Sequence, residues 1–253
     1  MINIVTKNWK ITNIEAIFFD KDGTIIDSHI YWGEIVKRRA KEIINYFNLN
    51  ENFYFYLSEK MGFSIKKNML LQKGPTGLHS RDVIIRTIVE ILNKKNIKTN
   101  FNEIENIFNK VHSEFLNDIT EYTKIIKEAY DFILKLKKEK IKLALITSDS
   151  IKNSLIILKN NNLDNIFDLV IAKENCEKPK VSGEPALFAL KNLNIDPLKT
   201  ICIGDAPMDK IMSENAKLKA AILVSTGQIN YNSLKRITKY SVKSLKELEI
   251  KRE

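Results

Sequence analysis

The stretch "AIFFDKDGTIID", residues 16–27, places two carboxylates, Asp20 and Asp22, directly after four apolar or small residues. Burying an unpaired charge is costly, so this arrangement at the end of a buried strand needs compensation from elsewhere in the chain. If Asp20 ends the strand and the chain then turns at Gly23, both carboxylates can face one space. One of them can then attack a phosphorus atom to form an aspartyl-phosphate, while the other moves protons.

A dianionic phosphate beside two carboxylates needs cations to offset the repulsion. Magnesium suits such a site because it takes oxygen ligands and binds through one or two carboxylates together with substrate phosphate. The segment "GDAPMD" offers Asp205 and Asp209 as further ligands, and "CEKPKVSGEP" offers Lys178 and Lys180 as a second cation. These residues are candidates for the missing compensation.

A hydroxyl and backbone donors for a phosphate oxygen are available in "LITSDS", which contains Thr147 and Ser148. Donors near a helix start favour anions, so both residues are candidates for binding a phosphoryl group. The alternative is that they only cap the helix that we expect to begin near Ile151, a frequent role for Ser and Thr. The two roles are compatible.

The elements that must position these residues alternate between strands and helices. Short apolar runs predict strands that are buried on both faces, at residues 16–20, 141–147, 168–172, 200–205 and 220–224. Helical patterns separate the later strands, which is typical of an α/β fold with a doubly wound parallel sheet. Asp20, Thr147 and Asp205 each end one of these strands, and ligands collect at that edge of such sheets.

About a hundred residues after Asp27 contain helical patterns and no convincing buried strand. We therefore expect a mainly α-helical insertion at 28–122 within a sheet domain formed by 1–27 and 123–253; a single unbroken domain is the alternative. A loop in the insertion, "QKGPTGLHSRDV", makes Lys73, His79 and Arg81 candidates for recognising the rest of a substrate. Alternatively, all three are solvated loop residues, and Ser80 is the N-cap of the following helix.

The composition, with 44% hydrophobic and 28% charged residues, is ordinary for a globular protein. The net charge of +10 comes from lysines scattered among acidic neighbours, which favours a solvated surface over nucleic-acid binding. No apolar run is long enough to span a membrane or to act as a signal peptide, so we expect a cytoplasmic location and no membrane partner. Cys176 and Cys202 are expected to be free thiols.

The motifs "DKDGT", "ITS", "EKPK" and "GDAPMD", in this order and at these strand ends, resemble the four motifs of the haloacid dehalogenase (HAD) superfamily. The position of the insertion is similar to that in members with a helical cap, such as phosphoglycolate phosphatases and β-phosphoglucomutases. The match covers about 12–27 and 123–230. It implies a Rossmann-like HAD core that carries a cap domain.

The resemblance implies that Asp20 is the nucleophile and Asp22 the general acid/base. It implies a Mg²⁺ held by the Asp20 carboxylate, the Asp22 backbone carbonyl and Asp205, with Asp209 supporting the ion directly or through water. It also implies that Thr147 binds the transferring phosphoryl group.

Gly23 and Thr24 would shape the turn, and Thr24 and Ser148 would join the substrate site. Dehalogenases lack the second aspartate and ion-pumping ATPases have threonine in its place, so Asp22 points to phosphatases and phosphomutases. The sequence departs from the usual K-P-x-P of the third motif. Lys178 keeps the following proline and is slightly favoured, whereas Lys180 lies at a more usual distance from the preceding strand.

Lys21 lies between the two aspartates, but alternation along an extended chain turns it away from both of them, and its role stays unassigned. We therefore expect a Mg²⁺-dependent phosphatase that acts on a small phosphorylated metabolite. The alternatives are a phosphomutase that uses the same aspartyl-phosphate, and a binding or regulatory protein that keeps the fold without turnover. The sequence specifies neither the substrate nor the oligomeric state.

Overall fold

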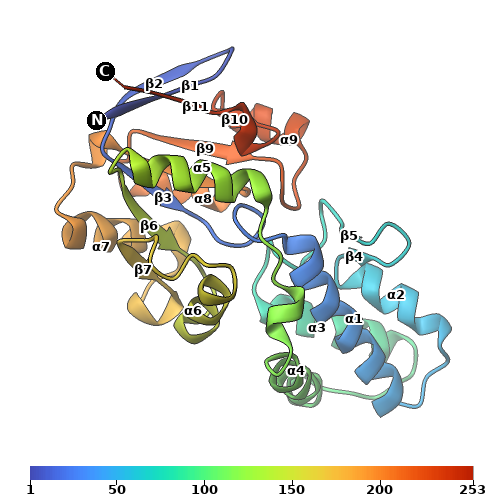
Figure 1. Ribbon diagram of the computed structural model, residues 1–253. Coiled ribbons are helices and arrows are strands. Elements are labelled where there is room, and N and C mark those ends of the chain that lie inside the picture. The colour runs from blue at the N-terminus through green and yellow to red at the C-terminus, as the bar shows by residue number, and fades with distance from the viewer. Residues whose placement is uncertain (253) are drawn as a thin grey trace. The chain divides into compact units, whose positions relative to one another are not determined.

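The protein is described here by a computed structural model that covers residues 1–252, and its chain divides into two compact units (Figure 1). One unit comprises Met1–Asp27 together with the chain from Lys124 onward. The other comprises Ser28–Thr123 and is mainly helical. Each unit has its own hydrophobic core.

The first unit is built on a six-stranded parallel sheet with the strand order β10-β9-β8-β3-β6-β7. Its strands are β3 (Ala16–Phe19), β6 (Lys142–Ile146), β7 (Leu169–Ile171), β8 (Thr200–Gly204), β9 (Ala220–Val224) and β10 (Ser241–Val242). The five strands expected from the sequence are all present, and the sheet is parallel and flanked by helices. The predicted α/β fold is therefore confirmed; the short strand β10 was not foreseen.

Helices follow the strands in the order that the sequence pattern predicts. They are α5 (Lys127–Lys138), α6 (Ile151–Asn160), α7 (Glu184–Leu193), α8 (Pro207–Asn215) and α9 (Tyr231–Ile237), with short 3₁₀ turns η2 (Lys173–Asn175), η3 (Lys180–Ser182), η4 (Pro197–Lys199) and η5 (Leu245–Glu247). In α5 the residues Ala129, Ile133 and Leu136 are fully buried, as their helical spacing requires.

The central strand β3 determines where the chemistry can occur. All four of its residues are fully buried, because it pairs with β8 on one side and β6 on the other. Ala16 and Phe18 pack in one cluster with residues of α7 and α8, so Ile17 and Phe19 face the opposite side of the sheet. Asp20, Thr147 and Asp205 directly follow three adjacent strands, β3, β6 and β8.

A separate three-stranded antiparallel sheet joins the two ends of the chain, and was not expected from the sequence (Figure 1). It consists of β1 (Ile2–Val5), β2 (Lys10–Ile14) and β11 (Glu249–Arg252), with β1 in the middle. The charged sequence of β11, "EIKR", carries little strand signal, and its partner lies at the other end of the chain. Pairing over this separation is invisible to local pattern analysis.

The helical unit contains α1 (Ser28–Tyr46), α2 (Asn52–Lys60), α3 (Arg81–Lys94), α4 (Phe101–Phe115), the short hairpin β4 (Phe63–Ser64) and β5 (Met69–Leu70), and the 3₁₀ turn η1 (Ile119–Tyr122). In α3 the residues Ile84, Ile85, Ile88 and Leu92 are buried, as their spacing predicts. The two-stranded hairpin was not anticipated.

Within residues 1–252, no helix has the length and apolar character needed to cross a bilayer. Both cysteines are free thiols, as expected, with Cys202 buried in β8 and Cys176 partly buried.

Replacement of Gly33 by alanine is expected to destabilise the helical unit. Gly33 lies inside α1, and a Cβ atom there would come within 2.4 Å of Cε2 of the buried Phe63. Overpacking of this kind costs about 1–3 kcal/mol, whereas alanine gains at most ~1 kcal/mol over glycine in a helix. We therefore expect a lower thermal unfolding midpoint for Gly33→Ala. The matched control is Asn45→Ala on the exposed face of α1, which should leave the midpoint unchanged or raise it; an unchanged midpoint for Gly33→Ala would contradict the packing described.

Candidate active site

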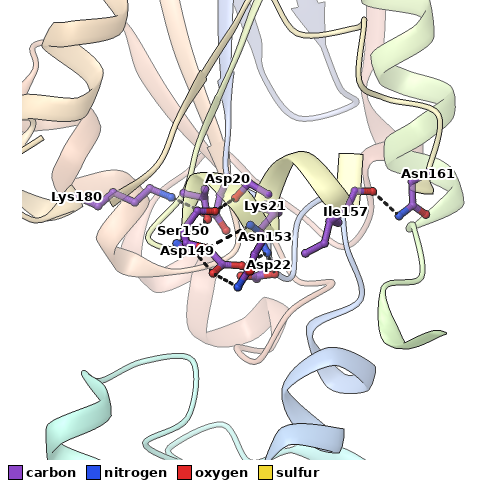
Figure 2. Close-up of polar contacts among 11 residues, drawn as sticks. Asp20, Lys21, Asp22, Asp149, Ser150, Asn153, Ile157, Asn161 and Lys180 are labelled. Atoms are coloured by element: carbon purple, nitrogen blue, oxygen red, sulfur yellow. Dashed lines mark hydrogen bonds and ion pairs between the residues drawn. The ribbon is translucent and has the colours of Figure 1, made fainter. Parts of the chain in front are cut away.

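Asp20 lies immediately after β3, at the edge of the sheet where the loops gather. Its backbone N–H donates to the carbonyl oxygen of Ile203 at 2.9 Å, which extends the pairing with β8 by one residue. Its side chain is 14% exposed, and Lys180 Nζ donates to its Oδ1 at 2.5 Å (Figure 2). Lys180 is the only residue within 1–252 that hydrogen-bonds this carboxylate, so Oδ2 is available for other chemistry.

Lys180 joins two carboxylates below the surface. Besides Asp20, its Nζ lies 2.6 Å from Oδ1 of Asp209, and its own side chain is 4% exposed. The second oxygen of Asp209, Oδ2, accepts a hydrogen bond from the backbone N–H of Ala206 at the start of α8. Burial alone would lower the pKa of Lys180, but the carboxylates of Asp20 and Asp209 hold it above its usual value, so the ammonium stays protonated.

The structure places Lys180 at the site and not Lys178, which the sequence slightly favoured. Within residues 1–252 Lys178 is exposed and makes no ion pair, whereas Lys180 is buried and makes two. The physical reason is the 3₁₀ turn η3, which begins at Lys180 and turns its side chain toward the sheet edge. The proline that follows Lys178 does not decide which lysine reaches the site.

Asp205 follows β8 and packs against two glycines. A Cβ atom at Gly23 or at Gly227 would lie 2.4 Å or 1.7 Å from its Oδ2, so neither position tolerates a side chain without movement. Gly23 also has φ of +81°, a conformation that glycine adopts without strain. Thr226 Oγ1 donates to the Gly23 carbonyl oxygen at 2.6 Å and ties the two glycine loops together.

Three carboxylates form a cluster that could hold a metal ion. One oxygen each of Asp20, Asp205 and Asp209 lies within 4.8 Å of the others. Oxygen donors of this kind fit Mg²⁺. Oδ2 of Asp209 accepts the Ala206 hydrogen bond, whereas its buried Oδ1 makes an ion pair with Lys180 but has no hydrogen-bond partner within residues 1–252, so Asp209 can support an ion directly or through water.

The electrostatics of this cluster favour a cation. Burial raises the pKa of Asp20 to about 7 in spite of the nearby Lys180, and burial together with the Asp20 charge raises the pKa of Asp205 well above its usual value. A bound divalent ion would oppose both shifts, because it stabilises the ionised carboxylates.

Lys21 contacts Asp22, which corrects the expectation that it points away from both aspartates. Its Nζ lies 2.8 Å from Asp22 Oδ1 and 3.0 Å from Asp149 Oδ2, and its side chain is fully buried (Figure 2). Strand alternation holds for Asp20 and Lys21 but ends there. The Lys21 carbonyl accepts from the N–H groups of Ile25 and Ile26, at 2.9 and 3.0 Å, and this turn brings Asp22 back toward the lysine.

The threonines lie deeper than the serine. Thr147 is buried after β6, and its Oγ1 accepts from the backbone N–H of Asp149 at 3.1 Å, while Ser148 is exposed. The α6 helix begins at Ile151, as expected, but its N-cap is Ser150, so neither Thr147 nor Ser148 caps it. Thr24 is fully buried, which favours a role in shaping the turn over contact with a substrate.

The three candidates in the helical unit differ in their surroundings. Lys73 and His79 are exposed. Arg81 Nη2 donates to the Glu105 carbonyl oxygen at 3.1 Å and to Asn109 Oδ1 at 2.7 Å, so it is already bound to α4. Ser80 occupies the N-cap position of α3, as expected, but its side chain makes no capping hydrogen bond.

The sequence analysis did not select Asp149 as a site residue. The signal for it was present in "LITSDS", where an acid lies two residues after Thr147 at a strand end, but nothing local identified Lys21 as its partner 128 positions away.

The sequence model of the haloacid dehalogenase-like hydrolase family matches residues 14–217 of this chain. The match spans the sheet unit from before β3 to the end of α8 and includes the helical insertion. The resemblance drawn from the four motifs is therefore confirmed.

Named relatives and a solved structure agree with this match. The phosphoglycolate phosphatase of Aquifex aeolicus is 26% identical over 220 residues, covering 87% of this chain and 89% of the relative. Pyrophosphatase PpaX of Bacillus cereus (strain Q1) is 26% identical over 208 residues, covering 82% of each. A crystal structure of a predicted phosphoglycolate phosphatase from Haemophilus somnus superposes with a TM-score of 0.72 at 15% identity, covering 94% of this chain and 97% of the other, which shows a shared fold.

Magnesium is expected to raise the unfolding midpoint, and to do so more at pH 8 than at pH 5.5. The pKa of Asp20 is raised from 3.8 to about 7 by burial, so without an ion this group lowers stability as pH rises from about 4 to about 7. Metal binding requires the deprotonated carboxylates and is therefore stronger above this window. At ten times its Kd the ion should add ~1.4 kcal/mol.

Thermal melts with and without MgCl₂ at the two pH values measure this effect. The control is Asp205→Asn, which should lose the magnesium-dependent shift at pH 8. An equal shift in the wild type and in Asp205→Asn would contradict the assignment of the metal ligands.

Proposed function

Because this chain belongs to the haloacid dehalogenase-like hydrolase family, we propose that it is a Mg²⁺-dependent phosphatase that acts on a small phosphorylated metabolite through an aspartyl-phosphate. The observation that carries this proposal is the environment of Asp20. Its carboxylate is fixed through one oxygen by Lys180, lies beside Asp205 and Asp209, and keeps its other oxygen free.

In this proposal Asp20 is the nucleophile. Its Oδ1 is held by Lys180 at 2.5 Å, so the carboxylate is oriented and Oδ2 can approach phosphorus without a change in the ion pair. An oriented nucleophile avoids much of the entropic cost of a bimolecular reaction. Lys180 also supplies positive charge near the transferring phosphoryl group, where negative charge must be balanced.

Asp22 is the proposed general acid/base. It lies two residues after the nucleophile, and burial raises its pKa above the usual value although Lys21 opposes the shift. A raised pKa favours the protonated form that a general acid needs. Nothing else in residues 1–252 apart from Lys21 hydrogen-bonds its carboxylate, so one oxygen is left for the substrate.

Mg²⁺ would be held by the carboxylates of Asp20 and Asp205 and the backbone carbonyl of Asp22, with Asp209 in support. When bound, the ion supplies charge neutralisation between the phosphate and these carboxylates. Thr147, at the end of the neighbouring strand β6, is the proposed contact for a phosphoryl oxygen.

The reaction then proceeds in two displacements. Asp20 Oδ2 forms a bond to phosphorus while the bond from phosphorus to the leaving oxygen breaks, and Asp22 donates its proton to that oxygen. The Asp22 carboxylate next accepts a proton from water, whose oxygen attacks phosphorus. The bond between phosphorus and Asp20 breaks, inorganic phosphate leaves, and the starting protonation state is restored.

The helical unit is the proposed cap domain, and Lys73, His79 and Arg81 are its proposed contacts with the non-phosphate part of the substrate. A cap that closes over a substrate excludes bulk water and favours small molecules. The names of the relatives make phosphoglycolate and pyrophosphate the first compounds to test. Such a metabolite is in keeping with the proposed cytoplasmic location.

A phosphatase screen tests the proposed reaction. The panel contains phosphoglycolate, pyrophosphate, sugar phosphates and nucleotides, each with and without MgCl₂, with Asp20→Asn as the blank. We expect release of inorganic phosphate from at least one compound, dependent on magnesium and lost in Asp20→Asn. An isomeric product without phosphate release would indicate a phosphomutase instead, and the absence of any turnover would contradict the proposal.

The two lysines give a paired test of the site. Lys180→Ala should lower kcat by about 10²–10³-fold, since it removes the charge that balances the phosphoryl group. Lys178→Ala should leave kcat unchanged, because this side chain is exposed and makes no ion pair within residues 1–252. Assays run well below the melting temperature of each variant separate this effect from unfolding. Equal activity of the two variants would remove Lys180 from the mechanism.

A further inference from the structure

Lys21 is the most deeply buried charged side chain of the site, with no exposed surface. A buried ammonium group is tolerated only with well-placed partners, because its desolvation costs several kcal/mol. Lys21 has two such partners, Asp22 Oδ1 at 2.8 Å and Asp149 Oδ2 at 3.0 Å. It therefore links the loop after β3 to the loop after β6.

Asp149 is the fixed end of this link. Its Oδ1 accepts from the backbone N–H of Ser150 at 2.7 Å and from Asn153 Nδ2 at 3.2 Å, both at the start of α6. Burial alone would raise its pKa, but Lys21 and these donors hold the pKa below the usual value. Asp149 is thus an ionised anchor that is tied to the helix.

Asp22 is the end of this link whose carboxylate is oriented by Lys21. It follows the strand, lies in the turn closed by the Lys21 carbonyl, and has Lys21 as the hydrogen-bond partner of its carboxylate within residues 1–252. Without the lysine, no hydrogen bond within residues 1–252 would orient the Asp22 carboxylate. Its second oxygen, Oδ2, is not engaged.

We propose that Lys21 is a positioning residue that fixes the proton-transfer oxygen of Asp22 by anchoring it, through Asp149, to the start of α6. The proposal rests on the phosphatase function described above. Lys21 does not touch the substrate and transfers no proton. It leaves Asp22 Oδ2 free and orients it for the leaving oxygen in the first displacement.

A positioning role and a merely structural role predict different kinetics. A misplaced general acid slows the reaction of an ester with a basic leaving group, which needs a proton, more than that of an ester with a weakly basic one, which leaves as an anion. General structural damage slows both reactions equally. Phenyl phosphate and 4-nitrophenyl phosphate provide this contrast, because they differ little in size but phenolate is the more basic leaving group.

The experiment measures single-turnover release of the phenol from each ester, with MgCl₂, so that only the first displacement is observed. For Lys21→Met we expect the rate with phenyl phosphate to fall about ten-fold more than the rate with 4-nitrophenyl phosphate. Asp149→Asn should act in the same direction and more weakly, since Lys21 still reaches Asp22. Asp149→Asn also serves as the test variant if Lys21→Met does not fold.

The matched control is Lys199→Met, which removes another lysine of the sheet unit that pairs with an acid, Glu15, at 3.0 Å. It should change neither rate. Equal losses on the two esters in both test variants, or no loss in either, would overturn the positioning role while the phosphatase function stands. Failure of the wild type to release either phenol, together with no phosphate release from any compound of the screen above, would overturn the phosphatase function, and the positioning role with it.

Discussion

The sheet edge depends on two buried lysines that hold four of its five aspartates close together. Lys180 joins Asp20 to Asp209, and Lys21 joins Asp22 to Asp149, while Asp205 packs against glycine backbone. Breaking a buried pair costs several kcal/mol, so each lysine and its acids are mutually required. Two ammonium groups do not balance five carboxylates. A divalent cation and the protonation of one acid can offset the remaining negative charge. The proposed mechanism uses a bound Mg²⁺ and a protonated Asp22.

Strand geometry explains why the two lysines serve different aspartates. Alternate residues of β3 face opposite sides of the sheet, so Asp20 continues the side of Ala16 and Phe18, which pack with α7 and α8. Lys180, just before α7, reaches Asp20 from that side. Lys21 continues the opposite side and meets Asp149. The turn at Lys21 then brings Asp22 to its own neighbour, so one short segment contributes to two separate ion-pair networks.

Much of this site could be predicted from the sequence, because buried strands and their polar ends are local signals. Asp20, Thr147 and Asp205 were placed correctly after adjacent strands, and the match to the family bears out the ordered motifs. What failed depended on geometry beyond a strand. The 3₁₀ turn η3 determines that Lys180, and not Lys178, reaches the site. The turn after Lys21 brings Asp22 into contact with it. The sheet of β1, β2 and β11 forms by pairing between the two ends of the chain.

The central claim is that Asp20 is the nucleophile and carries the phosphoryl group as an aspartyl-phosphate. It is tested most directly by quenching a single turnover in acid, reducing the protein with borohydride, which converts an aspartyl-phosphate to homoserine, and locating the change by peptide mass spectrometry. The account predicts homoserine at position 20 in the wild type and an unmodified peptide when substrate is omitted. Release of the leaving group ahead of inorganic phosphate at the time of the quench, with no modification at position 20 or with the modification at Asp22, would contradict it.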